Sequence, residues 1–116
     1  MPDDHRKYRR INMMNSAEVM LPGDQSGIEA LVDNVSYGGI GLYIPSQIAE
    51  GTEAIIRIIY NQGKGEKISE TLSGTVRWCR PFGTWYGVGI EFKYLNPKEH
   101  GRLLNYLDQA HRPEEE

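Results

Sequence analysis

The sequence contains six short runs of alternating apolar and polar residues, separated by turns that contain glycine or proline. Alternation with a period of two residues is typical of strands that bury one face. No stretch with helical spacing stands between two runs, so the strands are expected to pair antiparallel. Closing such a sheet removes its exposed edges, and the sequence therefore predicts a six-stranded antiparallel β-barrel. The runs cover about residues 13–21, 28–35, 40–44, 52–60, 68–79 and 86–94.

The hydrophobic period changes after the sixth run. Asn96 is a favourable N-cap, Pro97 suits the first helical turn, and Glu99 is placed to close a capping box. One C-terminal α-helix is therefore predicted over about 97–110, with its leucine face packed on the sheet. The apolar residues at helical spacing are Leu103, Leu104, Leu107 and Ala110.

The two ends of the chain differ in composition from the region between them. Residues 1–11 contain a basic cluster and few apolar side chains, and residues 111–116 end in three glutamates. We expect a flexible basic arm over 1–11, one barrel domain with its helix over 12–110, and an acidic tail over 111–116. A chain of 116 residues is long enough for one such domain with a single core.

Charge and hydropathy argue against several classes of protein. The formal net charge of −3 speaks against binding to a nucleic-acid polymer. No apolar run is long enough to cross a membrane, and the N-terminus lacks the apolar stretch of a signal peptide. The single cysteine, Cys79, cannot form an internal disulfide and is expected to be a buried or half-buried thiol in a cytoplasmic protein.

No combination of residues indicates catalysis or metal binding. His5, His100 and His111 are isolated, and Cys79 has no neighbouring cysteine, so the spacing of zinc ligands is missing. The glycine-rich segment 38–41 is followed by neither Lys-Ser/Thr nor a helix, which excludes a P-loop and a Rossmann fingerprint. Its glycines are expected to form a tight turn with positive φ. We expect a protein that is not an enzyme and that needs no cofactor or metal.

Two arginines near the start of the chain are suited to binding phosphate. Arg6 and Arg10 lie four residues apart in the basic segment. A guanidinium group offers phosphate a planar fork of donors, and it also pairs with the O6/N7 edge of guanine or stacks on a base. Composition alone favours a solvated basic arm, and the alternative is an arm that folds over an anionic, guanine-bearing ligand.

Together with a second motif, these arginines make the chain resemble the PilZ family. The family signature is RxxxR, followed about twenty to thirty residues later by (D/N)xSxxG. Residues 6–10, Arg-Lys-Tyr-Arg-Arg, and residues 34–39, Asn-Val-Ser-Tyr-Gly-Gly, match the two motifs. Residues 74–78 and 87–92 look like the final hairpin of the family, so the resemblance covers about 5–107. PilZ domains are barrels that receive the bacterial second messenger cyclic di-GMP and control motility, biofilm or polysaccharide.

The resemblance implies a site for cyclic di-GMP. Arg6 and Arg10 would hold its phosphates and a guanine edge or face. Asn34 and Ser36 would bind a guanine edge and the ligand backbone, and Gly39 would keep the turn open. Further candidates are His5, Arg9, Gly38 and Trp78.

Two residues of this site leave questions open. Many members of the family have Asp where this chain has Asn34; a carboxylate accepts two hydrogen bonds from guanine, whereas the NH₂ group of an amide would face a donor. Asp33 is adjacent, but on a regular strand it points to the other side. Alternation places Trp78 on the same face as Leu72 and Val76. An aromatic side chain there could stack on a base of the ligand, or it could fill the end of the barrel.

The sequence thus predicts a receptor that passes its signal to a protein partner through an arm ordered by the ligand, as a monomer or weak homodimer. The first alternative is a PilZ-like adaptor that binds protein and no nucleotide. A second is a barrel that binds single-stranded nucleic acid through the arm, Trp78 and Trp85, which the net charge opposes. A third, a flavin- or metal-using enzyme, has no supporting residues.

Overall fold

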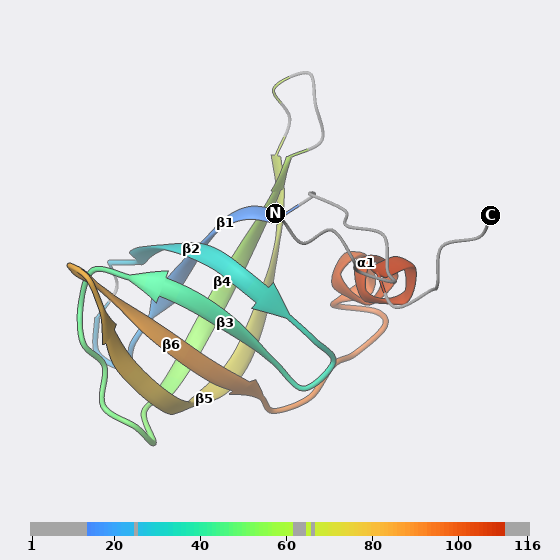
Figure 1. Ribbon diagram of the computed structural model, residues 1–116. Helices are drawn as coiled ribbons and strands as arrows, with labels where there is room; N and C mark the ends of the chain where they lie inside the picture. The colour runs from blue at the N-terminus through green and yellow to red at the C-terminus, as the bar shows by residue number, and fades with distance from the viewer. Residues whose placement is uncertain (1–13, 25, 62–64, 66, 111–116) are drawn as a thin grey trace.

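The strands close into one barrel in the computed structural model, which describes residues 14–24, 26–61, 65 and 67–110 (Figure 1). The predicted six-stranded antiparallel barrel with one C-terminal helix is confirmed. The helix, α1, covers Gly101–Ala110. The strands are β1 (Met14–Met20), β2 (Ile28–Val35), β3 (Gly39–Ile44), β4 (Glu53–Asn61), β5 (Lys67–Phe82) and β6 (Trp85–Phe92).

The order of the strands around the barrel is β1-β2-β3-β6-β5-β4, and β4 pairs with β1 to close it. All six pairings are antiparallel. Two of them, β3 with β6 and β1 with β4, join strands that are distant in sequence. Every strand therefore has a paired neighbour on each side, although residues 67–73 of β5 pair with β4 alone. The order also places β3 next to β6, whose other neighbour is β5.

Aliphatic side chains from all six strands fill the barrel. One buried residue from each strand, in chain order, is Val19, Ala30, Leu42, Ile56, Leu72 and Val88. Helix α1 adds Leu103 and Leu107, which are fully buried in the same cluster, so the predicted leucine face is confirmed at these two positions, whereas Leu104 is half-buried. Burial of a side chain of this size contributes about 1.5–3 kcal/mol, which makes the docked helix a substantial part of the core.

Helix α1 begins at Gly101, four residues later than predicted. The backbone carbonyl of Asn96 accepts a hydrogen bond from the N–H of His100 at 2.7 Å, which forms a separate turn before the helix. The N–H of Asn96 donates to Nδ1 of His100 at 2.9 Å. In a capping box that donor would bind the side chain of Glu99, so the predicted capping box is wrong and the imidazole takes its place.

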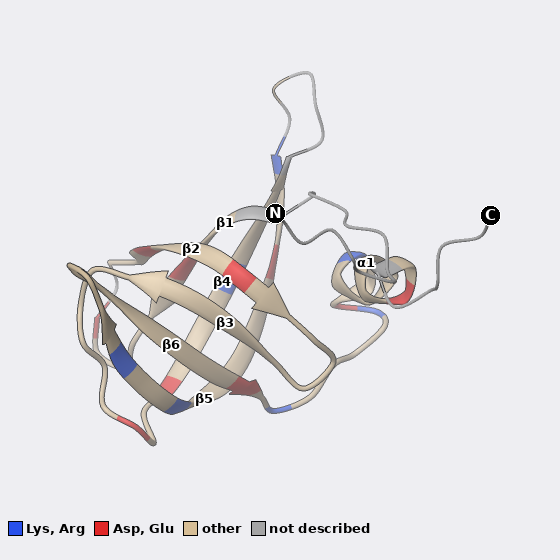
Figure 2. Ribbon diagram, in the orientation of Figure 1, with Lys and Arg blue, Asp and Glu red and all other residues tan. Residues whose placement is uncertain are grey.

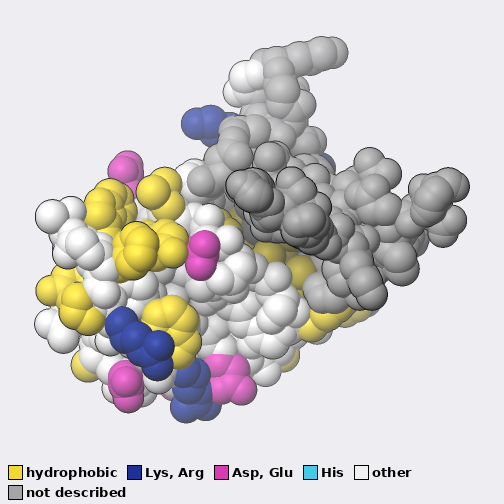
Figure 3. Space-filling view, in the orientation of Figure 1, with side chains coloured by type: hydrophobic (Ala, Val, Ile, Leu, Met, Phe, Trp, Pro, Cys, Tyr) yellow, Lys and Arg dark blue, Asp and Glu magenta, His cyan; other side chains and the backbone are white. Residues whose placement is uncertain are grey.

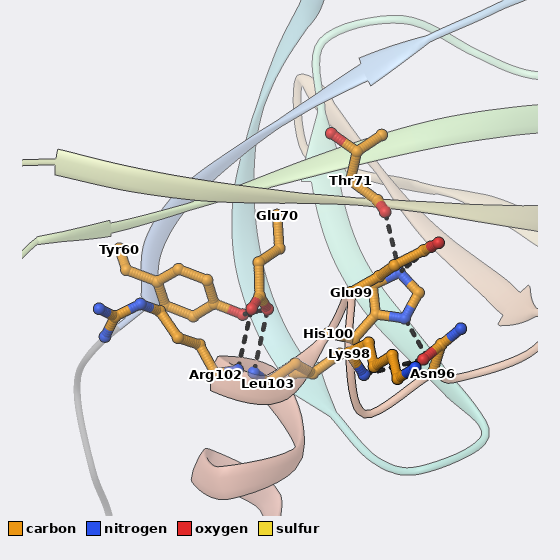
Figure 4. A network of polar contacts seen from close by, with 9 residues as sticks. All are labelled: Tyr60, Glu70, Thr71, Asn96, Lys98, Glu99, His100, Arg102 and Leu103. Carbon is orange, nitrogen blue, oxygen red and sulfur yellow. Dashed lines mark hydrogen bonds and ion pairs between the residues drawn. The ribbon is translucent and has the colours of Figure 1, made fainter.

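His100 joins the turn to the barrel and is 2% exposed (Figure 4). Because its Nδ1 accepts a hydrogen bond from Asn96, its Nε2 carries the proton and donates to the backbone carbonyl of Thr71 at 3.0 Å. Both ring nitrogens are satisfied in this way. The residue that the sequence left isolated therefore has a structural role.

Glu70 of β5 holds the first turn of α1 (Figure 4). Its carboxylate accepts hydrogen bonds from the backbone N–H groups of Arg102 at 2.8 Å and Leu103 at 3.1 Å. These are donors that a helix N-terminus leaves without an internal partner. The hydroxyl of the buried Tyr60 donates to the same carboxylate at 3.0 Å. One acidic side chain thus links β4, β5 and α1.

Stability is expected to fall above about pH 10 through Tyr60. Burial and the Glu70 carboxylate raise the pKa of Tyr60 above its ordinary value of 10.0. The unfolded chain ionises this tyrosine above that pH while the folded chain keeps it neutral, so rising pH favours unfolding. Urea unfolding between pH about 8 and about 11 should show a smaller alkaline loss of stability for Tyr60→Phe than for the wild type.

The matched control is Tyr86→Phe, which removes a phenol hydroxyl from a half-buried tyrosine of β6. This variant should keep the alkaline loss of the wild type. An alkaline loss in Tyr60→Phe as large as that of the wild type would contradict the assignment.

Candidate functional site

A β-bulge in β2 turns the second motif to the outside of the barrel. Val32 and Asn34 pair with consecutive residues of β3, so Asp33 is an extra residue between them. Regular alternation would place Asn34 inside the barrel with Val32. With the bulge, Asn34 is exposed, and Val35 packs against the core in its place.

The same bulge overturns the expectation that Asp33 points away from Asn34. Both side chains are exposed, and Nδ2 of Asn34 donates a hydrogen bond to Oδ2 of Asp33 at 2.9 Å. The extra residue interrupts the alternation on which that expectation depended. A carboxylate therefore stands beside the motif asparagine.

A second bulge, in β5, turns Trp78 outward. Val76 and Trp78 pair with consecutive residues of β6, and Arg77 is the extra residue. Val76 is fully buried, whereas Trp78 is 38% exposed. The prediction that Trp78 shares the face of Val76 is therefore wrong, and the indole does not fill the barrel end.

Two paired glycines form the floor between Asn34 and Trp78. Gly41 of β3 pairs with Gly89 of β6. A Cβ atom on Gly41 would stand 3.0 Å from Nδ2 of Asn34, and one on Gly89 would overlap the indole nitrogen of Trp78. Both side chains thus lie flat on backbone that only glycine leaves open.

These residues border a shallow depression of about 260 Å³, which we call the outer hollow. Pockets that enclose a drug-sized ligand usually measure about 300–1,000 Å³. The outer hollow is therefore suited to part of a ligand. It brings together the described members of the predicted site with Arg77 and Glu91; those members are Asn34, Ser36, Gly38, Gly39 and Trp78.

The turn between β2 and β3 is held by Ser36. Its N–H donates to the carbonyl of Gly39 at 2.8 Å, and its Oγ accepts from the N–H of Gly38 at 3.2 Å. Neither glycine has positive φ, so that prediction is wrong. Gly39 is needed for another reason, because a Cβ atom there would overlap the backbone carbonyl of Ile90 on β6.

Tyr37 connects this turn to helix α1. Its hydroxyl donates a short hydrogen bond to Oδ1 of Asp108, and that bond raises the pKa of Tyr37 above its ordinary value. Tyr37 occupies a variable position of the motif, so no sequence signal identified it. The contact gives the turn at the outer hollow a direct link to the helix.

Charged and aromatic groups surround the outer hollow. The guanidinium carbon of Arg80 lies 5.2 Å from the ring centroid of Trp78, within range of a cation–π contact. Nε of Arg77 donates to Oε1 of Glu91. Figure 2 shows Lys and Arg dispersed among acidic residues on the strands, and Figure 3 shows hydrophobic side chains gathered on the same face. This surface offers rings for stacking together with single cations, and it has no broad basic area among the residues coloured by charge.

Some predictions fall outside the described residues. These are the arm over 1–11, the acidic tail over 111–116, and four candidate ligand-binding residues, Arg6, Arg10, His5 and Arg9.

Within the described part of the chain, no three His, Cys, Asp or Glu residues are grouped to hold a metal ion. No helix in that part is long and apolar enough to span a bilayer. Cys79 is half-buried against the core, as predicted.

Comparisons with known proteins show the family and the fold of this chain. A family model described as PilZ domain matches residues 4–109. The inhibitor of motility MotI/DgrA of Bacillus subtilis has a similar structure, with a TM-score of 0.64 and 18% sequence identity; the match covers 93% of this chain and 55% of that one. The chain therefore spans about half the length of that protein.

A second similar structure is the PilZ domain with c-di-GMP of YcgR from Escherichia coli. Its TM-score is 0.58 at 15% identity, and the match covers 94% of this chain and 93% of that one. At these identities the two structures establish the fold. No curated protein sequence matches the chain.

Proposed function

Because this chain belongs to the PilZ domain family, we propose that it is a receptor for cyclic di-GMP that has no catalytic activity of its own. The observation that carries the proposal is the outer hollow, where two bulges turn Asn34 and Trp78 to the same glycine floor. A barrel fold alone does not specify a ligand. The chemistry of the outer hollow supports a guanine nucleotide as the ligand, because it combines an amide, a hydroxyl and an indole around open backbone.

Each group of the outer hollow has a place in binding guanine. The amide of Asn34 supplies a hydrogen-bond acceptor for the donors of the guanine edge. The exposed indole of Trp78 supplies a stacking surface, and Ser36 supplies a hydroxyl for the ligand backbone. The phosphates are assigned to Arg6 and Arg10, whose guanidinium groups suit them.

The energies of these contacts are sufficient for micromolar binding. A micromolar dissociation constant corresponds to about 8 kcal/mol. Hydrogen bonds to charged groups contribute about 1.5–3 kcal/mol each, and one stacked base contributes about 1–3 kcal/mol. Two arginines, Asn34, Ser36 and one stacked guanine exceed the requirement, and ordering a segment of the chain takes back about 2–5 kcal/mol.

In the proposed switch, the ligand draws Arg6 and Arg10 across the outer hollow, and the combined surface of arm and ligand binds a protein partner. The bond between Tyr37 and Asp108 offers a route by which the turn moves helix α1. Motility, biofilm and polysaccharide control are the outputs that we consider, since one similar structure is named an inhibitor of motility.

Calorimetric titration of the chain with cyclic di-GMP tests the proposal and gives the stoichiometry. We expect a dissociation constant in the micromolar range or somewhat below it, and little heat with cyclic di-AMP. The absence of heat at tens of micromolar, with the fold intact by circular dichroism, would overturn the receptor assignment. That result would favour the adaptor that binds protein without nucleotide.

A further inference from the structure

We propose that Asp33 is a positioning residue that fixes the orientation of the Asn34 amide and thereby selects guanine over adenine. This inference rests on the proposed function, since it concerns the same ligand. Asp33 lies outside the PilZ motif, and the regular strand pattern directs it away from the site.

The bulge in β2 makes the contact between the two residues possible. Asp33 and Asn34 are neighbours on the outer face, and the amide nitrogen of Asn34 lies 2.9 Å from Oδ2 of Asp33. An ionised carboxylate has acceptor atoms only. The Asn34 amide must therefore turn its NH₂ group toward Asp33, and the opposite orientation would bring two oxygens together.

The floor of the outer hollow restricts the amide further. A Cβ atom on Gly41 would stand 3.0 Å from Nδ2 and 3.2 Å from Oδ1 of Asn34, so the amide lies flat over this glycine. With one N–H of Nδ2 donated to Asp33 and the amide held in this orientation, Oδ1 is the acceptor that Asn34 presents to a ligand. The site then presents an acceptor at the position where the motif presents a carboxylate in many members of the family.

An acceptor at this point discriminates between the two purines. The Watson–Crick edge of guanine carries donors at N1 and N2, whereas adenine has an acceptor at N1 and a donor at N6. An amide that flips freely can offer its NH₂ group to adenine N1 and its oxygen to N6, and so accommodates adenine as well. Asp33 removes that orientation, and its own charge also disfavours the N1 acceptor of adenine.

Binding of both cyclic dinucleotides to Asp33 variants tests this role. In Asp33→Ala the preference for cyclic di-GMP over cyclic di-AMP, measured as the ratio of dissociation constants by competition, should fall about tenfold. Asp33→Asn should also lose most of the preference, because its amide offers a donor as well as an acceptor and so accepts either orientation of the Asn34 amide. Asp33→Glu keeps a carboxylate with acceptors only and should retain most of the preference. Rescue by Asp33→Glu together with loss in Asp33→Asn would tie the preference to an acceptor-only side chain at this position.

The control is Glu29→Gln, which removes a negative charge from an exposed residue of the same strand. It should leave the ratio unchanged. An unchanged ratio in Asp33→Ala, or equal weakening of both ligands, would overturn the positioning role while the wild type still binds cyclic di-GMP. Failure of the wild type to bind cyclic di-GMP would instead remove the proposed function, and this inference with it.

Discussion

Replacing Arg10 with alanine is expected to weaken cyclic di-GMP binding about hundredfold. Among the described residues that border the outer hollow, Arg77 is the only cation, and its guanidinium is engaged by Glu91. The hollow therefore provides groups for a base and little for two phosphates. A guanidinium from the second half of the RxxxR motif supplies charge-assisted hydrogen bonds worth about 1.5–3 kcal/mol each. Isothermal titration calorimetry measures the loss.

Two variants separate specific contacts from general attraction. Lys7→Ala removes the same charge from the same segment outside the motif positions, and we expect less than about a threefold loss. Arg10→Lys keeps the charge but lacks the planar fork, so an intermediate loss of about tenfold is expected. Equal losses in Arg10→Ala and Lys7→Ala would indicate screened, nonspecific attraction and would contradict a defined phosphate contact.

The barrel could be predicted because its strands follow the two-residue period closely. The second strand, for example, was expected over 28–35 and has those bounds. Turn residues marked the ends of the strands, and the absence of crossover helices indicated antiparallel pairing. The start of α1 was predicted less well, because the buried imidazole of His100 replaced the expected cap through contacts with β5, which are distant in sequence.

The two bulges could not be predicted, and the geometry of the site depends on them. Trp78 continues the apolar alternation after Val76, so nothing local indicates that the strand gains a residue. The bulge becomes understandable only when β6 is beside β5 and Gly89 leaves room for the indole. Likewise, Asn34 is seen to lie outside the barrel only once β2 is paired with β3. The roles of Arg6 and Arg10 remain predictions from the motif.

Gly39→Ala is expected to destabilise the fold by about 2–3 kcal/mol. A Cβ atom at this position would overlap the backbone carbonyl of Ile90 and stand 3.3 Å from the Cα of Glu91, so β3 and β6 would have to separate. Backbone atoms in a closed barrel move less readily than the end of a flexible side chain. Urea unfolding followed by circular dichroism measures the change in the free energy of unfolding.

The neighbouring glycine provides the control for this variant. A Cβ atom on Gly38 would have its nearest contact at 3.9 Å, at Oγ of Ser36, and the φ of Gly38 is not positive, so Gly38→Ala should change stability by less than about 0.5 kcal/mol. The comparison separates two reasons for a glycine in the motif. If Gly39→Ala unfolded at the same urea concentration as the wild type and lost only ligand binding, the glycine would serve access for the ligand. A loss of stability confined to Gly39→Ala would instead mean that the motif glycine is needed for close packing of β3 against β6. The floor of the outer hollow, where these two strands pair, would then depend on that packing.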